Sequence, residues 1–154
     1  MAQSEKRIEE CYHLTLTFLD ANIFVYAFLK PKRKLQPHEE KIKDAAKNII
    51  TRINTGEETA TSVVHFSEVC NILEDYLPIE EAFAIEKDLL LRDNIVIKAV
   101  TEEHYLKALA IAEDQSVGAN DALAYVLMTE SGLNRIYSFD KHFDAFKDIR
   151  RIIE

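Results

Sequence analysis

Two kinds of hydrophobic pattern alternate along the chain. In the first kind, apolar and β-branched residues stand close together in a short stretch, which predicts a strand. Residues 14–19 (LTLTFL) are of this kind, and their character is typical of a strand buried on both faces of a parallel sheet. Four later stretches are also predicted to be strands: 59–61, 95–100, 135–138 and 151–153.

In the second kind of pattern, apolar residues recur every three or four positions, which predicts amphipathic helices. Between residues 38 and 54, isoleucine and alanine follow this spacing, and Gly56 comes shortly after as a helix terminator. Comparable patterns predict helices over residues 23–29, 64–76, 78–91, 101–114 and 118–131.

The order of these elements predicts the fold class. Strands that alternate with helices form βαβ units, whose parallel strands are joined by right-handed crossovers. We therefore expect an α/β fold, a three-layer α/β/α sandwich with a mostly parallel central sheet of about five strands. The 154 residues fit one domain. Residues 1–13 are mostly polar and are interpreted as an N-terminal extension, and residues 14–154 as a single domain.

Composition narrows the class of protein. The 19 basic and 27 acidic residues give a formal charge of −8, which argues against a protein that coats nucleic acid by bulk attraction. It leaves open a nucleic-acid enzyme whose acids are neutralised by bound cations. The chain shows no signal peptide and no apolar run of membrane-spanning length, and its two cysteines form no disulfide framework or zinc motif. A cytoplasmic protein is expected.

Four acids fall where a parallel sheet places its functional edge. Asp20 ends the first strand and Asp140 follows the strand over 135–138, while Glu68 and Asp121 lie near the starts of two helices. Taken alone, Glu68, Asp121 and Asp140 are explained as acids that stabilise a helix start or a turn. Asp20 is different because apolar residues surround it, and a buried carboxylate is costly unless it is paired or binds a cation.

The motifs around these acids resemble a known family. LTFLDANIF, SVVHFSEV, GANDALAYVLMTESG and IYSFDKHFD, in this order, are similar to the motifs of the PIN-domain family, which includes the VapC-type toxins of toxin–antitoxin pairs. The resemblance runs from about Leu14 to the C-terminus. It implies a PIN-like fold, cleavage of RNA with Mg²⁺ or Mn²⁺, an antitoxin partner and a homodimer. In VapC-like proteins, helices at the position of residues 64–91 commonly carry the dimer or antitoxin contacts.

The resemblance also implies roles for individual residues. The catalytic and metal-binding acids would be Asp20, Glu68, Asp121 and Asp140, with Asn22 and Ser138 in support. This agrees with the chemistry of phosphodiester hydrolysis, because hard divalent cations stabilise the charged transition state, activate water and prefer carboxylate oxygens as ligands. His65 and His142 lie near these acids in the sequence. Either is a candidate contact to metal or phosphate, and for both a structural or an exposed histidine is the commoner role.

A basic cluster follows the helix predicted over 23–29. Lys30, Lys32, Arg33 and Lys34 are candidate RNA contacts, and a solvated loop explains them equally well. The leading hypothesis is a metal-dependent endoribonuclease that acts as the toxin of a two-component pair. The alternatives are a non-catalytic PIN-like module that binds RNA or protein, and a housekeeping RNA-processing nuclease. A receiver-like phosphoacceptor domain ranks low, because the chain lacks the expected early pair of adjacent acids and a convincing strand-end lysine.

Overall fold

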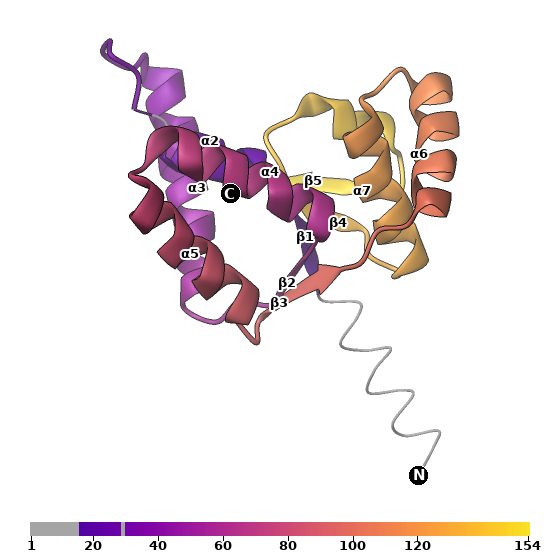
Figure 1. The fold of residues 1–154 in the computed structure, drawn as a ribbon. Coiled ribbons are helices and arrows are strands. Elements are labelled where there is room, and N and C mark those ends of the chain that lie inside the picture. The colour runs from indigo at the N-terminus through magenta and orange to yellow at the C-terminus, as the bar shows by residue number, and fades with distance from the viewer. Residues whose placement is uncertain (1–15, 29) are drawn as a thin grey trace.

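Five short strands form a parallel sheet at the centre of the computed structural model (Figure 1). The structure describes residues 16–28 and 30–154, so the extension predicted over 1–13 lies outside the described residues. The order of the strands across the sheet is β3-β2-β1-β4-β5, and all four neighbouring pairs are parallel. Their bounds are β1 Thr17–Leu19, β2 Thr59–Ser62, β3 Ile95–Lys98, β4 Arg135–Tyr137 and β5 Arg150–Ile152.

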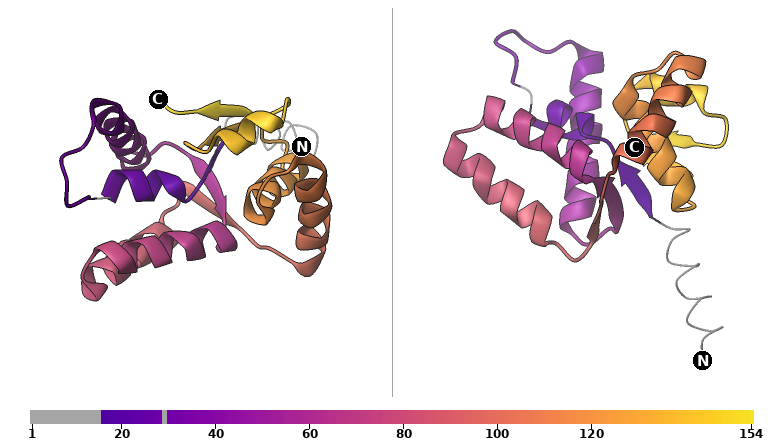
Figure 2. Two further views of the ribbon diagram at one scale, coloured as in Figure 1. Left: turned by 90° about the horizontal axis from the view of Figure 1, so that it is seen from above. Right: turned by 45° about the vertical axis from the view of Figure 1, so that its right-hand side comes forward.

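Helices cover both faces of this sheet (Figure 2). On one face lie α2 (Asn22–Phe28), α3 (Pro37–Asn54), α4 (Val63–Tyr76) and α5 (Ile79–Leu91). On the other face lie α6 (Glu102–Gln115) and α7 (Ala119–Glu130), with the short 3₁₀ helix η1 (Lys141–Ala145) beside them. The predicted three-layer α/β/α sandwich is therefore confirmed, and among the described residues the sheet is wholly parallel.

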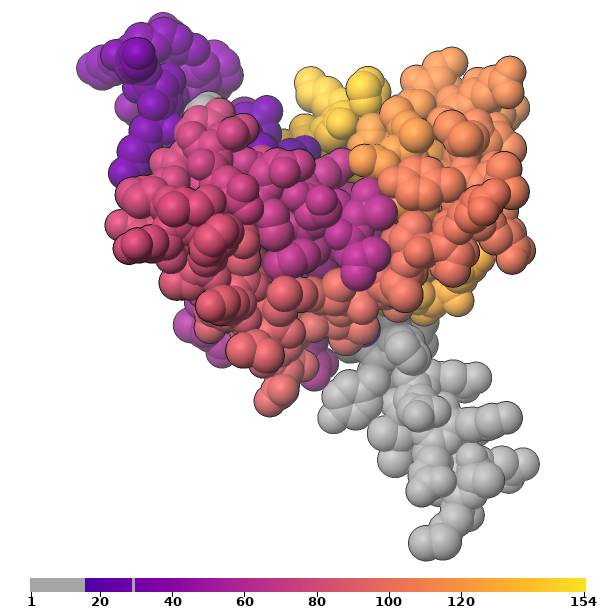
Figure 3. All heavy atoms as spheres, in the orientation of Figure 1, coloured from indigo at the N-terminus to yellow at the C-terminus, as the bar shows by residue number. Residues whose placement is uncertain are grey.

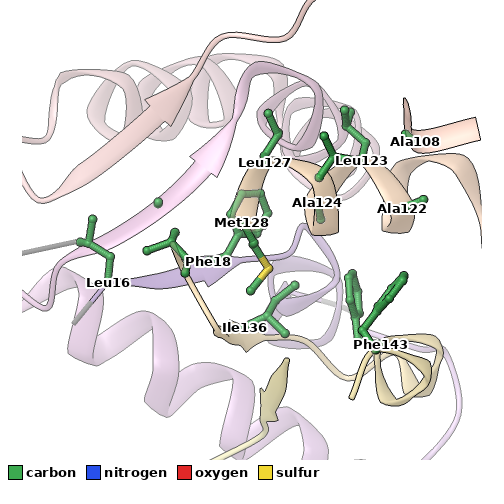
Figure 4. Close-up of a cluster of buried hydrophobic side chains, with 14 residues drawn as sticks. Leu16, Phe18, Ala108, Ala122, Leu123, Ala124, Leu127, Met128, Ile136 and Phe143 are labelled. Carbon is green, nitrogen blue, oxygen red and sulfur yellow. The ribbon is translucent and has the colours of Figure 1, made fainter. Parts of the chain in front are cut away.

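The alternation of side chains along β1 divides the core into two clusters. Phe18 packs with Met128 and Ile136 in the cluster under α6 and α7 (Figure 4), whereas Leu19 packs in the cluster under α2 to α5. Because successive strand residues face opposite sides of the sheet, one strand contributes to both clusters. Phe18 and Leu19 are almost completely buried, which explains the continuous apolar run in the sequence.

The order of the strands creates a switch point between β1 and β4. From β1 the chain moves outward to β2 and β3, and it then returns across the sheet to form β4 on the opposite side of β1. In open α/β sheets, the crevice at the carboxyl ends of two such strands is the usual ligand site. Asp20 follows β1 directly, and Asp140 follows β4 after two intervening residues.

Several strands are shorter than the sequence predicts, because a strand ends where its neighbour ends. The stretch predicted over 95–100 ends at Lys98, which pairs with Ser62, the last residue of its only neighbour β2. The stretch predicted over 135–138 ends at Tyr137, which pairs with Leu19, the last residue of β1. This leaves Ser138 outside the ladder at the carboxyl edge of the sheet. None of the helices in the described part of the chain is long and apolar enough to span a membrane.

Candidate active site

Four different elements carry the four predicted acids to one region. Asp20 follows β1, Glu68 lies in the second turn of α4, Asp121 lies in the first turn of α7, and Asp140 is the N-cap of η1. In the space-filling view, the surface is hollowed between the lobe of α2 to α5 and the lobe of α6, α7 and the C-terminal segment, and these elements border the hollow (Figure 3). The fold alone brings these acids together, since the sequence separates them widely.

The acids form two adjoining groups. Potential ligand atoms of Asp20, His65 and Glu68 lie within 4.8 Å of one another, and so do those of Asp121, Asp140 and His142. The two groups are close enough to interact electrostatically. The charge of Asp140 raises the pKa of Asp20, and the charge of Asp20 raises the pKa of Asp121. The site is therefore one concentration of negative charge with contributions from both faces of the sheet.

The pKa values of two acids record this concentration. Burial is the main cause that raises the pKa of Asp20 from 3.8 to about 6; the hydrogen bond from Ser138 opposes the rise, and the charges of Glu68 and Asp140 add to it. Burial also raises the pKa of Asp121 to about 6, with added repulsion from Asp140 and Asp20. A carboxyl whose pKa rises in this way is disfavoured as an anion, and a nearby cation would reverse the effect.

A hydrogen-bond network around Ser138 links the ends of β1 and β4. The Ser138 hydroxyl is fully buried and donates to Asp20 Oδ2 at 2.6 Å. The hydroxyl oxygen of Ser138 in turn accepts hydrogen bonds from Asn22 Nδ2 at 3.2 Å and from the backbone N–H of Asp140 at 3.0 Å. Asn22 also accepts a hydrogen bond from the backbone N–H of Phe139 through its Oδ1, at 3.3 Å. The two residues expected to support the site thus contact Asp20 or the segment that leads to Asp140.

Asp140 and Asp121 flank His142 on the more exposed side of the site. One carboxylate oxygen of Asp140 accepts from the backbone N–H of His142 at 2.9 Å, so Asp140 caps η1 as well as facing the site. The His142 Nδ1 lies 3.2 Å from Asp140 Oδ1 and 3.5 Å from Asp121 Oδ2, and its side chain is 62% exposed. His142 is therefore an exposed histidine that lies beside two of the acids.

His65 is held in one neutral tautomer by its two neighbours. Its Nε2 lies 3.2 Å from the backbone carbonyl of Asn120, which can only accept, so Nε2 carries the proton. Its Nδ1 lies 2.6 Å from the hydroxyl of Ser62, which donates to it while accepting the backbone N–H of His65 as the N-cap of α4. Burial lowers the pKa of this imidazole, which favours the same neutral form. With both nitrogens engaged, His65 is a structural histidine and not a free metal ligand.

Glu68 is held by two residues that the sequence did not single out. The Asn120 amide donates from Nδ2 to Glu68 Oε1 at 2.5 Å, and Asn120 Oδ1 accepts from the Tyr105 hydroxyl at 2.9 Å. Asn120 lies directly before Asp121, and its place inside the motif GANDALAY was the only signal of proximity. Tyr105 belongs to α6, and no pattern in the sequence connects it with the site.

Gly118 leaves room for Asp121. It is the N-cap of α7 with φ of −66°, a value open to any residue, so backbone strain does not require glycine there. A Cβ at this position would lie 3.3 Å from Asp121 Oδ2. The absence of a side chain thus allows the Asp121 carboxylate to fold back over the start of its own helix.

The donor set fits a hard divalent cation. Apart from the exposed imidazole of His142, the groups that remain open to a ligand are carboxylate oxygens, which Mg²⁺, Mn²⁺ and Ca²⁺ prefer, while neither His65 nitrogen is open. The raised pKa values of Asp20 and Asp121 point the same way, because the charge of Asp140 acts on both carboxyls and that of Asp20 also acts on Asp121.

The basic loop lies between α2 and α3, at the edge of the molecule (Figure 1). Lys30, Lys32 and Lys34 are exposed there. Arg33 is different, because its guanidinium forms a two-point ion pair with Glu39, at 2.6 and 2.8 Å. Of the four predicted RNA contacts, Arg33 is therefore already paired within the chain.

Comparison with known proteins agrees with this architecture. The sequence profile described as "PIN domain" matches residues 17–149. The chain therefore belongs to the PIN-domain family. It is 27% identical over 120 residues to the ribonuclease VapC13 of Mycobacterium tuberculosis, and the match covers 75% of this chain and 87% of VapC13. A VapC ribonuclease of Mycobacterium bovis matches to the same extent.

Solved structures share the fold. The crystal structure of Mycobacterium tuberculosis VapC20, described as a sarcin–ricin loop cleaving toxin, has a TM-score of 0.62 at 19% identity and covers 84% of this chain and 93% of its own. A toxin–antitoxin complex from Klebsiella pneumoniae has a TM-score of 0.60 at 12% identity, covering 87% and 95%. VapBC2 of Rickettsia felis, bound to a promoter DNA fragment, has a TM-score of 0.58 at 16% identity, and the match covers 89% of this chain and 97% of that one. At these identities the likeness concerns the fold alone.

Proposed function

We propose that this chain is an endoribonuclease that depends on Mg²⁺ or Mn²⁺ and acts as the toxin of a toxin–antitoxin pair. The observation that carries the proposal is the convergence of Asp20, Glu68, Asp121 and Asp140 at the switch point of a PIN-domain fold. The relatives named as ribonucleases and as toxins support the class of reaction.

In this proposal the acids divide into two roles. Asp20, Asp121 and Asp140 hold the cation, and Glu68 either completes its ligands or orients a water molecule toward it. A bound divalent cation would stabilise the charge of the phosphodiester transition state and lower the pKa of a bound water. Ser138 keeps Asp20 directed into the site through its 2.6 Å hydrogen bond, and Asn22 holds the Ser138 hydroxyl in place. Outer contacts of this kind orient the ligands of a metal.

We expect the RNA backbone to approach a site that is itself acidic. The chain carries a formal charge of −8, so affinity must come from local cations and not from bulk attraction. Lys30, Lys32 and Lys34 are the proposed contacts because they are exposed and grouped in one loop. We assign Arg33 to holding this loop against the first turn of α3 through Glu39.

The antitoxin is proposed to cover exposed apolar side chains on α4 and α5. Tyr76, Ile79, Phe83 and Leu90 are each about half exposed, between 46 and 52%. Apolar residues grouped in this way on a soluble domain commonly mark protein interfaces. The Klebsiella pneumoniae structure, a toxin–antitoxin complex, and the Rickettsia felis structure of VapBC2 support such a partner. A homodimer contact is proposed for the same helix pair.

The test is cleavage of a structured RNA by the purified chain. We expect cleavage with Mn²⁺ and none with EDTA, and we expect Asp20→Asn to reduce the rate at least about a hundredfold. Asp44→Asn is the matched control, because it removes the same charge from an exposed position on α3. Equal cleavage by Asp20→Asn and the control would refute the proposal. RNA binding by wild-type protein without any metal-dependent cleavage would favour the non-catalytic module instead.

Co-expression separates a toxin from a housekeeping nuclease. A toxin should arrest growth when it is expressed alone, and a small protein encoded beside it should restore growth and copurify with it. We expect Phe83→Asp to weaken that copurification while RNA cleavage stays at the wild-type rate, because Phe83 is exposed on α5 and does not belong to the acidic site. If the wild-type protein cleaves RNA but does not arrest growth, it is a housekeeping nuclease.

A further inference from the structure

A chain of hydrogen bonds connects Glu68 to α6, a helix that carries none of the four acids of the candidate active site. Tyr105 on α6 donates to Asn120 on α7, and Asn120 donates to Glu68 on α4. These helices belong to different faces of the sheet, since α4 packs in one core cluster and α6 and α7 in the other. The chain of hydrogen bonds therefore crosses the molecule where the two acidic groups meet.

The partners of Asn120 define the orientation of its side chain. Glu68 can only accept as a carboxylate, so the amide nitrogen of Asn120 faces it. The amide oxygen is then left for Tyr105, whose hydroxyl donates at 2.9 Å. Burial, with the charge of Glu68, raises the pKa of Tyr105, so its hydroxyl keeps its proton near neutral pH. The backbone of Asn120 is held as well, because its carbonyl accepts from His65.

Asn120 thereby engages one of the two Glu68 carboxylate oxygens. The 2.5 Å hydrogen bond to Oε1 fixes the rotation of the carboxylate, which leaves Oε2 as the oxygen without this constraint. A carboxylate fixed by one outer donor loses less freedom when its other oxygen binds a cation or a water. Without Asn120, the Glu68 side chain would sample several rotamers beside three other acids.

We propose that Asn120 and Tyr105 are positioning residues for Glu68, with Tyr105 acting only through Asn120. The inference deepens the proposed function, because it rests on Glu68 serving a divalent cation. It assigns to α6 a part in the site through a single hydroxyl group. The α6–α7 pair then has a purpose beyond covering the sheet.

The molecule offers a matched control for the tyrosine hydroxyl. Tyr125 lies on α7, is half-buried like Tyr105, and places its hydroxyl 3.0 and 3.1 Å from the two carboxylate oxygens of Asp148. Its ring stacks on Phe146, and its hydrogen-bond partner is exposed and is not one of the four acids. Tyr125→Phe therefore removes a comparable hydroxyl without touching Glu68.

The experiment measures the Mn²⁺ affinity of the 154-residue chain from the electron paramagnetic resonance signal of the Mn²⁺ that stays free in solution. The variants are Tyr105→Phe, Asn120→Ala, the double variant and the control Tyr125→Phe. Loss of an outer-shell partner typically weakens metal binding ten- to a hundredfold, so we expect about tenfold for Asn120→Ala. For Tyr105→Phe we expect about threefold, the effect of one modest hydrogen bond. The double variant should match Asn120→Ala, because Tyr105 has no effect once Asn120 is gone.

Three further measurements make the outcome decisive. Thermal unfolding of each variant shows whether a loss of Mn²⁺ affinity accompanies a general loss of stability. A loss of affinity from that cause would appear in Tyr125→Phe as well. RNA cleavage at rising Mn²⁺ should recover toward the wild-type rate in Tyr105→Phe. Tyr105→Trp, which restores a donor in another place, should not recover affinity at low Mn²⁺.

The inference is overturned if Tyr105→Phe binds Mn²⁺ as tightly as Tyr125→Phe, or if the losses in the double variant add. When wild type cleaves RNA in that experiment, the proposed function survives and only the positioning role fails. When wild type binds Mn²⁺ with the expected pattern across the variants but cleaves no RNA, the positioning role stands and the proposed function fails. Wild-type protein that binds no Mn²⁺ overturns both.

Discussion

Replacing Asp20 by asparagine should stabilise the metal-free protein while it removes activity. Asp20 is 7% exposed, and its carboxyl has a pKa of about 6 in place of 3.8. Each pKa unit corresponds to 1.36 kcal/mol, so keeping this group ionised costs the folded state about 3 kcal/mol at neutral pH. Asparagine keeps an oxygen that accepts the Ser138 hydrogen bond and carries no charge. We expect Asp20→Asn to raise the free energy of unfolding by about 2 to 3 kcal/mol at pH 7.5.

The gain should depend on pH in a defined direction. The pKa of Asp20 is higher in the folded than in the unfolded chain, so folding takes up a proton between about pH 4 and pH 6. The contribution of this group to stability is fully present below pH 3.8 and is lost as the pH rises through about 6. The difference between Asp20→Asn and wild type should therefore be below about 1 kcal/mol at pH 4 and reach its full size above pH 6.5. Asp121 titrates in the same window, so wild type and variant should both lose stability there, and wild type should lose more.

Urea unfolding in EDTA at pH 4, 5, 6.5 and 7.5 measures the effect, with far-ultraviolet circular dichroism as the signal. Asp44→Asn should stay within about 0.5 kcal/mol of wild type throughout. Added Mn²⁺ should stabilise wild type by mass action and Asp20→Asn much less, so the difference between them shrinks. An Asp20→Asn protein that is no more stable than wild type at pH 7.5 in EDTA would refute the electrostatic reasoning.

Three further predictions concern single contacts of the site. Ser138→Ala removes the hydroxyl that donates to buried Asp20, so the free energy of unfolding at pH 7.5 should fall by about 2 kcal/mol in urea. The midpoint of the activity–pH profile should move to higher pH, because the Asp20 carboxyl loses a donor that lowers its pKa. Gly118→Ala should lower kcat/KM several-fold, because the new Cβ would lie 3.3 Å from the Asp121 carboxylate, and excess Mn²⁺ should partly restore the activity. The melting temperature should change little, and unchanged activity would contradict the close packing. Lys32→Ala should raise KM for RNA and flatten the slope of log affinity against log salt concentration by about 0.7, the value for one phosphate contact of a single strand. An unchanged slope would indicate that this loop is solvated and does not contact RNA.

The sequence predicts the fold well because the pattern that it carries is local. Alternating strands and helices define the α/β class, and a parallel sheet brings the carboxyl ends of its strands to one edge. Asp20 and Asp140 could therefore be placed near each other from the ends of two strands alone. Glu68 and Asp121 were placed at the same edge from their positions near the starts of two helices, and the family motifs gave all four acids their roles; these helices reach the edge only through the tertiary packing of α4 and α7.

What could not be predicted depends on distant pairs of atoms. The resemblance gave Ser138 a supporting role without its partner: its hydroxyl and the carboxylate of Asp20 are separated by 118 positions, and only the adjacency of β4 and β1 joins them. Tyr105 reaches Asn120 because α6 and α7 form a hairpin, and a tyrosine in an amphipathic helix gives no sign of a polar partner. The five-residue helix η1 is also too short to leave a periodic pattern.

The position of β4 in the chain has a consequence for synthesis. β1 lies between β2 and β4, and β4 is made only after 134 earlier residues. A nascent chain that has released β1, β2 and β3 still lacks the Ser138 hydroxyl that orients Asp20, and it lacks Asp140 altogether. Under the proposed function, an unfinished toxin cannot cut the messenger that encodes it or the ribosome that is making it. Because Asp140 is the last of the four acids to be synthesised, the complete acidic site can form only after β4 and the start of η1 have been made.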